Sequence, residues 1–272
     1  MSADLLQTVV AAARRSAEER ARAVAQGPAA EAFARAAADA APRAGEFVQS
    51  LRQPGIRVVA ECKRRSPSRG VLRHDYDAVA IARSYEAAGA AAISVLTEPA
   101  FFDGSLDDLR RVRASVSVPV LRKDFIVTRF QIEEARAAGA DAVLLIVAAL
   151  DDRALADLLR AAGTAGLAAL VEVHDDAELE RALHAGASLV GVNSRNLRTL
   201  EVDVAVFDRI AARLPPHVTT VAESGLRTAD DLFRLHALRY DGFLIGERLV
   251  TQPDPGAALA ALRVAAEGVT LR

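Results

Sequence analysis

Short apolar runs recur along the chain from about residue 57 onward, and longer stretches rich in Ala, Leu and Arg separate them. The runs are continuously apolar rather than alternating, which is typical of strands that are covered on both faces in a parallel sheet. The stretches between them are long enough for one helix each. The pattern therefore predicts eight strand–helix units, with strands that begin near Arg57, Ala92, Val118, Asp141, Leu167, Ser188, Val218 and Asp241.

Eight such units favour an α/β fold whose parallel sheet closes on itself, a (β/α)8 TIM barrel. Three predicted helices are followed by glycine, which is the expected residue just past a helix end: Ala88-Gly89-Ala90, Ala138-Gly139-Ala140 and Ala185-Gly186-Ala187. An open doubly wound sheet is the alternative. It would leave edge strands, and none of the eight runs is weak or polar enough to be one.

The region before the first strand has a different pattern. Residues 4–24 have the spacing of an amphipathic helix, and residues 29–40 predict a second, Ala-rich helix that begins after Pro28. Neither segment concentrates reactive side chains, so we expect residues 1–50 to be an N-terminal helical cap on one barrel end. No linker or low-complexity segment divides the chain, so residues 1–272 are expected to form a single domain.

Composition narrows the classes of function. The chain has 272 residues, a formal net charge of −2 and an isoelectric point near 6.2, so nothing electrostatic favours binding to nucleic acid or a membrane surface. The longest apolar run, residues 142–150, is too short to span a bilayer, and no signal peptide is evident. The single cysteine, Cys62, is interpreted as a small buried hydrophobe. We expect a cytoplasmic protein, since no intrachain disulfide is possible.

Charged side chains stand at the predicted carboxyl ends of several strands, where barrels of this type carry their chemistry. Glu61 and Lys63 end the first strand on a shared face, because alternate strand residues point the same way. Lys123 ends the third strand, Glu172 the fifth and Glu223 the seventh. One such residue is usually an ion pair, but several at one opening favour a catalytic site. A lysine there suits general-acid work, and a glutamate opposite can accept the returning proton.

A second group of residues points to phosphate. Ser224-Gly225 follows the seventh strand and Gly246-Glu247 follows the eighth, and the loops after these strands are the usual phosphate site of a barrel. Small residues there let backbone N–H groups approach an anion. Ser66, in the loop after the first strand, is placed to add a hydroxyl to the same group.

Other chemistries find no support in the sequence. The histidines lack metal-ligand spacing, no glycine fingerprint for a nucleotide lies between a strand and a helix, and no nucleophilic triad stands out. We therefore expect no metal site. His174 follows the fifth strand, and a role at a helix N-terminus or in solvent is favoured for it over catalysis.

These residues resemble the indole-3-glycerol phosphate synthase family of tryptophan biosynthesis. The matching stretches run through the whole barrel in order: residues 60–68 (AECKRRSPS), 94–98 (SVLTE), 101–105 (FFDGS), 121–125 (LRKDF), 171–174 (VEVH), 191–197 (GVNSRNL) and 222–225 (AESG). The resemblance implies a carboxy-lyase that needs no cofactor. Its reaction closes a ring in 1-(2-carboxyphenylamino)-1-deoxyribulose 5-phosphate and removes carbon dioxide and water, which gives indole-3-glycerol phosphate.

The resemblance also implies a role for each site residue. Lys123 would be the general acid at the ketone oxygen, Glu172 would stabilise positive charge on the substrate nitrogen, and Lys63 would hold the carboxylate and act in dehydration. How the acid roles divide between the two lysines stays open. The remaining implied residues are the catalytic partner Glu61, the orienting Asn193, the supporting Arg195 and Glu223, the phosphate-lining Ser66, Ser224, Gly225, Gly246 and Glu247, and the ring wall Phe125 and Leu144.

Two positions depart from the family pattern, because Ser194 stands where a second asparagine is common and Arg248 where a small residue is usual.

Two rival functions are weighed. A phosphoribosylanthranilate isomerase would need a Cys/Asp acid–base pair at two strand ends, and a non-catalytic phospholigand-binding barrel would not need Glu61, Lys63, Lys123 and Glu172 together. The expected partner is the small phosphosugar-anthranilate substrate, with no nucleic acid or membrane, and the expected state is a monomer or weak homodimer.

Overall fold

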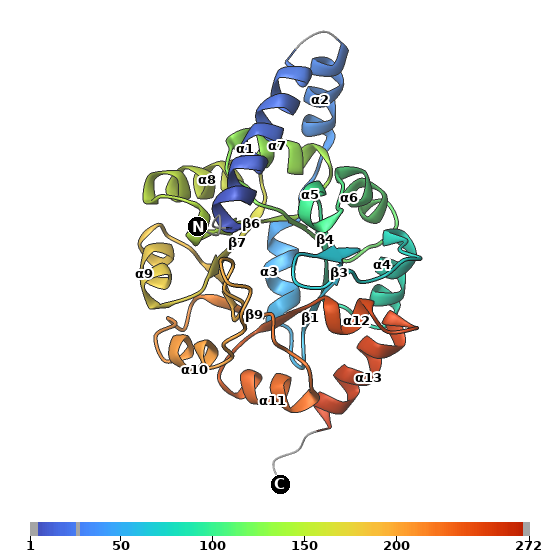
Figure 1. The fold of residues 1–272 in the computed structure, drawn as a ribbon, viewed down its shortest axis with the longest axis vertical. Helices are drawn as coiled ribbons and strands as arrows, with labels where there is room; N and C mark the ends of the chain where they lie inside the picture. The colour runs from blue at the N-terminus through green and yellow to red at the C-terminus, as the bar shows by residue number, and fades with distance from the viewer. Residues whose placement is uncertain (1–4, 26–27, 269–272) are drawn as a thin grey trace.

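The structure is a computed structural model that describes residues 5–25 and 28–268. Eight parallel strands form a closed barrel in which each strand pairs with the next along the chain and the last pairs with the first (Figure 1). These strands are β1 (Val58–Cys62), β4 (Ala92–Leu96), β5 (Val120–Lys123), β6 (Ala142–Ile146), β7 (Ala168–Val173), β8 (Leu189–Asn193), β9 (Thr219–Glu223) and β10 (Gly242–Ile245). The closed (β/α)8 barrel is therefore confirmed, and the open sheet is excluded.

Helices surround the barrel, and most of them begin at a side chain that caps their first turn. Asp, Ser or Thr side chains accept hydrogen bonds from these backbone N–H groups, and Thr128 and Thr228 form full capping boxes. Gly89 and Gly139 have positive φ just after their helices, as predicted. The ring contains α4 (Ala78–Ala87), α6 (Leu106–Arg113), α7 (Arg129–Ala137), α8 (Asp152–Thr164), α9 (Asp176–His184), α10 (Val206–Ala211), α11 (Ala229–Ala237) and α13 (Pro255–Glu267).

Shorter elements lie in the loops at the carboxyl ends of the strands. The loop after β1 folds into an antiparallel ribbon in which β2 (Arg65–Ser66) pairs with β3 (Gly70–Val71). The others are α5 (Pro99–Phe102), the 3-10 helix η1 (Val147–Ala149) and α12 (Glu247–Val250). All of these elements border the end of the barrel where the sequence predicts chemistry.

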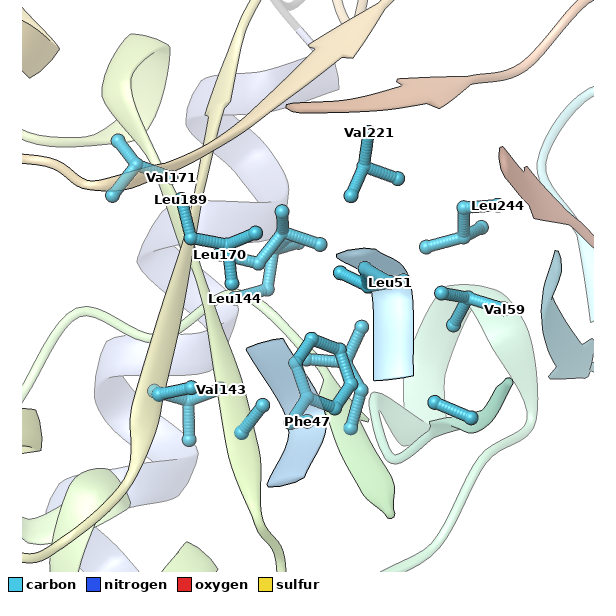
Figure 2. Close-up of a cluster of buried hydrophobic side chains, with 14 of the residues drawn as sticks. Phe47, Leu51, Val59, Val143, Leu144, Leu170, Val171, Leu189, Val221 and Leu244 are labelled. Atoms are coloured by element: carbon cyan, nitrogen blue, oxygen red, sulfur yellow. The ribbon is translucent and has the colours of Figure 1, made fainter. Parts of the chain in front are cut away.

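Three helices precede the barrel, and the sequence predicted two of them. The predicted pair is α1 (Leu5–Val24) and α2 (Pro28–Asp39), which extend together beside α7 (Figure 1). The unpredicted helix is α3 (Ala44–Arg52), which buries Phe47 and Leu51 completely in the barrel core (Figure 2). Arg52 donates to Thr219 at the start of β9, so α3 closes the amino-terminal end of the barrel.

A chain of ion pairs, partly exposed at Arg20 and buried at Arg122, links α1 to the strand that carries Lys123. Arg20 of α1 pairs with Glu134 of α7 at 2.6 Å, and Glu134 pairs with Arg122 of β5 at 3.0 Å. Arg122 also pairs with Asp124 at 2.9 Å. Because neighbouring strand residues face opposite sides, Arg122 and Asp124 anchor β5 from outside the barrel while Lys123 faces inward.

Among the described residues, no helix combines the length and the apolar character that a membrane span requires.

Candidate active site

A cavity of about 500 Å³ opens at the carboxyl ends of the strands, and residues from all eight strands or the loops that follow them line it. Every site residue expected from the sequence lies on its wall: Glu61, Lys63, Ser66, Lys123, Phe125, Leu144, Glu172, Asn193, Arg195, Glu223, Ser224, Gly225, Gly246 and Glu247. The structure thus brings together positions that are far apart in the sequence, as the barrel topology requires.

Glu61 and Lys63 form an ion pair at the end of β1, with 2.5 Å between Lys63 Nζ and Glu61 Oε1. Both side chains are mostly covered, which makes the pair stronger than one in open solvent. Between them, Cys62 points away from the cavity, and its Sγ lies 3.8 Å from the carbonyl oxygen of Ala78. Burial raises the pKa of the Cys62 thiol, so it remains an unreactive hydrophobe.

Lys123 lies between two glutamates that are removed from solvent. Its Nζ is 3.3 Å from Oε2 of Glu172 and 3.7 Å from Oε2 of Glu223. Burial alone would lower the pKa of Lys123, but the surrounding acidic groups, Glu172 first among them, outweigh it and raise that pKa above its ordinary value. Lys123 is therefore a charged ammonium that can donate a proton to an oxygen that becomes negative.

The two glutamates around Lys123 are not equivalent. Burial alone would raise the pKa of Glu172, but Lys123 and His174 outweigh it and hold that pKa below its usual range. Burial and the negative charge of Glu172 raise the pKa of Glu223 well above its usual range. Glu172 is therefore the ionised acceptor, and Glu223 is the carboxyl group that keeps a proton.

One glycine on a neighbouring strand and one just after a neighbouring strand make room for two of these carboxyl groups. A Cβ atom at Gly191 of β8 would collide with Oε1 of Glu223, and one at Gly246 would collide with Oε1 of Glu61. The absence of a side chain at both positions allows a carboxylate to lie directly against the neighbouring backbone.

One side of the cavity presents backbone that is shaped for an anion. Ser224 and Gly225 both have positive φ, at 65° and 70°, and successive residues in such turns form concave sites lined by N–H groups. Ser66 is buried at the same mouth. Glu247 differs from expectation in one respect, since its carboxylate pairs with Arg69 at 2.9 Å and joins the β1 loop to α12. The side chain of Glu247 is therefore engaged, and only its backbone is open to an anion.

The opposite wall is apolar. Phe125 and Leu144 line it as expected, together with Leu96 and Ile146. Phe102 also lines the cavity, with its ring centroid 6.4 Å from that of Phe125, although the sequence did not single it out for this wall. Two rings at this separation form a surface suited to a flat aromatic group.

His174 and Arg248 are two positions where the structure refines the expectation. His174 is not a solvent residue, because its ring lies against Glu178 in the first turn of α9 and against Glu172. The expected role at a helix N-terminus is confirmed by the contact with Glu178. Arg248 lies at the cavity edge, where its Nε donates to the carbonyl oxygen of Arg227.

Within the described ranges, no group of three or more His, Cys, Asp and Glu side chains is arranged to hold a metal ion.

A sequence model of the indole-3-glycerol phosphate synthase family matches residues 7–262. The chain belongs to this family. Indole-3-glycerol phosphate synthase from Mycolicibacterium gilvum is 56% identical over 228 residues, which cover 84% of each chain. The synthase from Streptomyces griseus is 52% identical over 232 residues, which cover 85% of this chain and 86% of the relative.

Solved structures agree on the fold. The tryptophan synthase alpha chain from Legionella pneumophila has a TM-score of 0.62 at 13% identity, and the match covers 85% of this chain and 99% of that one. Thiamine phosphate pyrophosphorylase from Pyrococcus furiosus has a TM-score of 0.60 at 18% identity over 78% of this chain and 96% of that one. Membership of the indole-3-glycerol phosphate synthase family confirms the expectation of an enzyme, a carboxy-lyase of tryptophan biosynthesis.

The raised pKa of Glu223 gives a stability prediction. A carboxyl whose folded pKa exceeds its unfolded pKa of about 4.3 costs stability as pH rises above that unfolded value. Glu223→Gln should therefore stabilise the protein more at pH 8 than at pH 4.5. Urea unfolding at both pH values measures the difference. The exposed Glu133→Gln serves as control, and an equal effect of Glu223→Gln at both pH values contradicts the assigned protonation.

Proposed function

We propose that the chain converts 1-(2-carboxyphenylamino)-1-deoxyribulose 5-phosphate into indole-3-glycerol phosphate, carbon dioxide and water, with the cavity residues in the roles below. The placement of Lys123 carries this proposal. Its ammonium lies between an ionised and a protonated glutamate, with an anion-shaped turn on one side and an apolar wall on the other.

The substrate has a phosphate at one end and an aromatic ring at the other, and the cavity has a backbone turn suited to an anion on one side and an apolar wall on the other. We assign the phosphate to the backbone of Ser224, Gly225 and Gly246 with the hydroxyl of Ser66, and the carboxyphenyl ring to Phe125 and Leu144. Lys63 then faces the ring carboxylate. Fixing both anionic ends folds the sugar chain back on the ring, which removes most of the entropy cost of ring closure.

Ring closure joins the carboxyl-bearing ring carbon to the ketone carbon. As that bond forms, the ketone oxygen gains negative charge and takes a proton from Lys123, so the product of this step is an alcohol. The ring nitrogen supplies the electrons and becomes positive. Glu172 faces this charge as a carboxylate, and Asn193 and Arg195 orient the groups around it.

Loss of carbon dioxide returns an electron pair to the ring and restores its aromaticity. The alcohol then leaves as water once Lys63 protonates it, and a glutamate accepts the proton released as the indole forms. Two protons leave the lysines and one returns from the substrate, so one proton is taken up from solvent in each turnover. Glu223 beside Lys123 is suited to passing that proton to the lysine and taking up another. All these steps use groups on the cavity wall.

The two rivals lose their basis in this geometry. An isomerase of the related pathway step would need a cysteine in the cavity, and Cys62 points away from it with a raised pKa. A binding module would have no use for a desolvated lysine and three glutamates around one small space.

We also propose a cellular location for the protein, which is the cytoplasm. A single free thiol suits the reducing cytoplasm. We also propose that the partner is the small substrate alone, with neither nucleic acid nor membrane, and that the protein is a monomer or weak homodimer.

Purified protein should turn the ribulose phosphate substrate into a fluorescent indole product without added metal. The gene should also rescue a tryptophan auxotroph that is blocked at this step. Absence of both product and rescue, with folded protein present, would refute the proposed reaction.

Lys123→Ala should lower kcat on the order of a hundredfold or more, since the general acid at the ketone oxygen is lost. Steady-state fluorescence kinetics measures this. Arg248→Ala, at the cavity edge and outside the acid–base set, is the control and should retain kcat. Near-normal turnover of Lys123→Ala would remove Lys123 from its role.

A further inference from the structure

His174 and Glu172 face each other with buried atoms that have no other partner among the described residues. Nε2 of His174 lies 3.4 Å from Oε1 of Glu172, and neither atom makes a hydrogen bond elsewhere in this part of the chain. The other oxygen of Glu172, Oε2, is occupied by Lys123. Buried polar atoms are rarely left unpaired, so two of them at this distance indicate a charge interaction between the ring and the carboxylate.

The opposite nitrogen of the ring is fixed by a second carboxylate. Nδ1 of His174 lies 2.9 Å from Oε2 of Glu178, which also accepts the backbone N–H of His174 at 2.8 Å. A carboxylate can only accept, so Nδ1 must carry a proton. Nε2 then faces a second carboxylate, and an unprotonated Nε2 would set a lone pair against a lone pair. Both nitrogens are protonated in the stable arrangement, and the ring is an imidazolium.

Two carboxylates lie against the ring, and Arg181 of α9 donates to the carbonyl oxygens of Val147 and Leu150. Glu172 contacts it from the end of β7 and Glu178 from α9. The 3-10 helix η1, which packs on β7 and α9, contributes only the apolar Val147, Ala148 and Ala149. Burial alone would lower the pKa of His174, but the two carboxylates outweigh it and raise that pKa to about 10.

This contact adds to the difference between the two glutamates beside Lys123. Both are buried and both approach the same ammonium, but Glu172 accepts a hydrogen bond from Lys123 at 3.3 Å, whereas Glu223 lies 3.7 Å from it. Glu172 has His174 as a second positive neighbour. Glu223 has none, and neither of its oxygens makes a hydrogen bond to the described part of the chain. The proton therefore goes to Glu223, and Glu172 stays ionised.

We propose that His174, held by Glu178, is a positioning residue that binds Oε1 of Glu172 and so keeps this glutamate ionised and aimed at the substrate nitrogen. The inference rests on the role proposed above for Glu172. His174 acts through Glu172 and does not touch the substrate.

The first test reads the protonation of His174 directly and needs no turnover. In protein labelled with 15N at histidine, one imidazole should remain doubly protonated at pH 8, and its signals should be missing from His174→Gln. His184→Gln, which changes an exposed histidine at the end of α9, should leave those signals in place. If the signals assigned to His174 titrate near the ordinary value of about 6.5, the inference is wrong.

The second test uses the pH dependence of kcat. Loss of the imidazolium raises the pKa of Glu172, so the acid limb of His174→Ala should move to higher pH by about one unit, with activity recovering at higher pH. Glu178→Gln lowers the pKa of His174, so its alkaline limb should move to lower pH. His174→Gln keeps a neutral donor and should shift the acid limb less than His174→Ala.

The outcomes separate the two proposals. A uniform loss of kcat at every pH, with unmoved limbs, means that His174 only supports the fold and overturns the inference while the reaction stands. If the unaltered enzyme forms no indole product, the proposed reaction fails, and the histidine signals still decide whether His174 is an imidazolium paired with Glu172.

Discussion

One ammonium group between two buried glutamates organises the active end of this molecule. Lys123, Glu172 and Glu223 end β5, β7 and β9, and Glu61 ends β1. These are alternate strands of the closed barrel, so the four side chains form the uppermost of the layers that fill such a barrel. Lower layers are apolar, with Leu170, Val221 and the α3 residue Phe47 among them. The active site is thus a layer of the barrel interior that is built from charged side chains instead of apolar ones.

Such a layer costs stability unless its charges are balanced, and the surrounding structure shows how the balance is reached. Gly191 and Gly246 have no side chain, which leaves space for the carboxyl groups of Glu223 and Glu61. Arg122 and Asp124 secure β5 from its outer face through Glu134 and Arg20, which leaves Lys123 as the inward residue of that strand. Burial and the negative charge of Glu172 raise the pKa of Glu223, so this third glutamate keeps its proton. A protonated glutamate beside Lys123 is suited to a reaction in which that lysine gives up a proton and must regain one.

Much of this arrangement could be predicted from the sequence because it depends on local periodicity. Continuous apolar runs gave the strands, and the residue that ends each run gave the cavity wall, since all parallel strands end on one side. Other features depend on pairs that are distant in sequence. Nothing near Arg69 indicates that it pairs with Glu247, and nothing near Arg20 indicates Glu134. The helix α3 was missed because nine residues with two core side chains, Phe47 and Leu51, are too few for a clear helical period. His174 and Glu178 are four residues apart, but their importance appears only when Glu172 is seen beside them.

The central claim is that Lys123 meets the ketone oxygen while the phosphate lies on the turn at Ser224 and Gly225. It is tested most directly by a crystal structure with the substrate analogue whose ketone has been reduced to an alcohol. We expect the alcohol oxygen to lie within hydrogen-bond distance of Lys123 Nζ, and the phosphate to accept hydrogen bonds from the backbone N–H groups of Ser224, Gly225 and Gly246. An analogue bound with its phosphate elsewhere, or with its alcohol oxygen out of reach of Lys123, would contradict it.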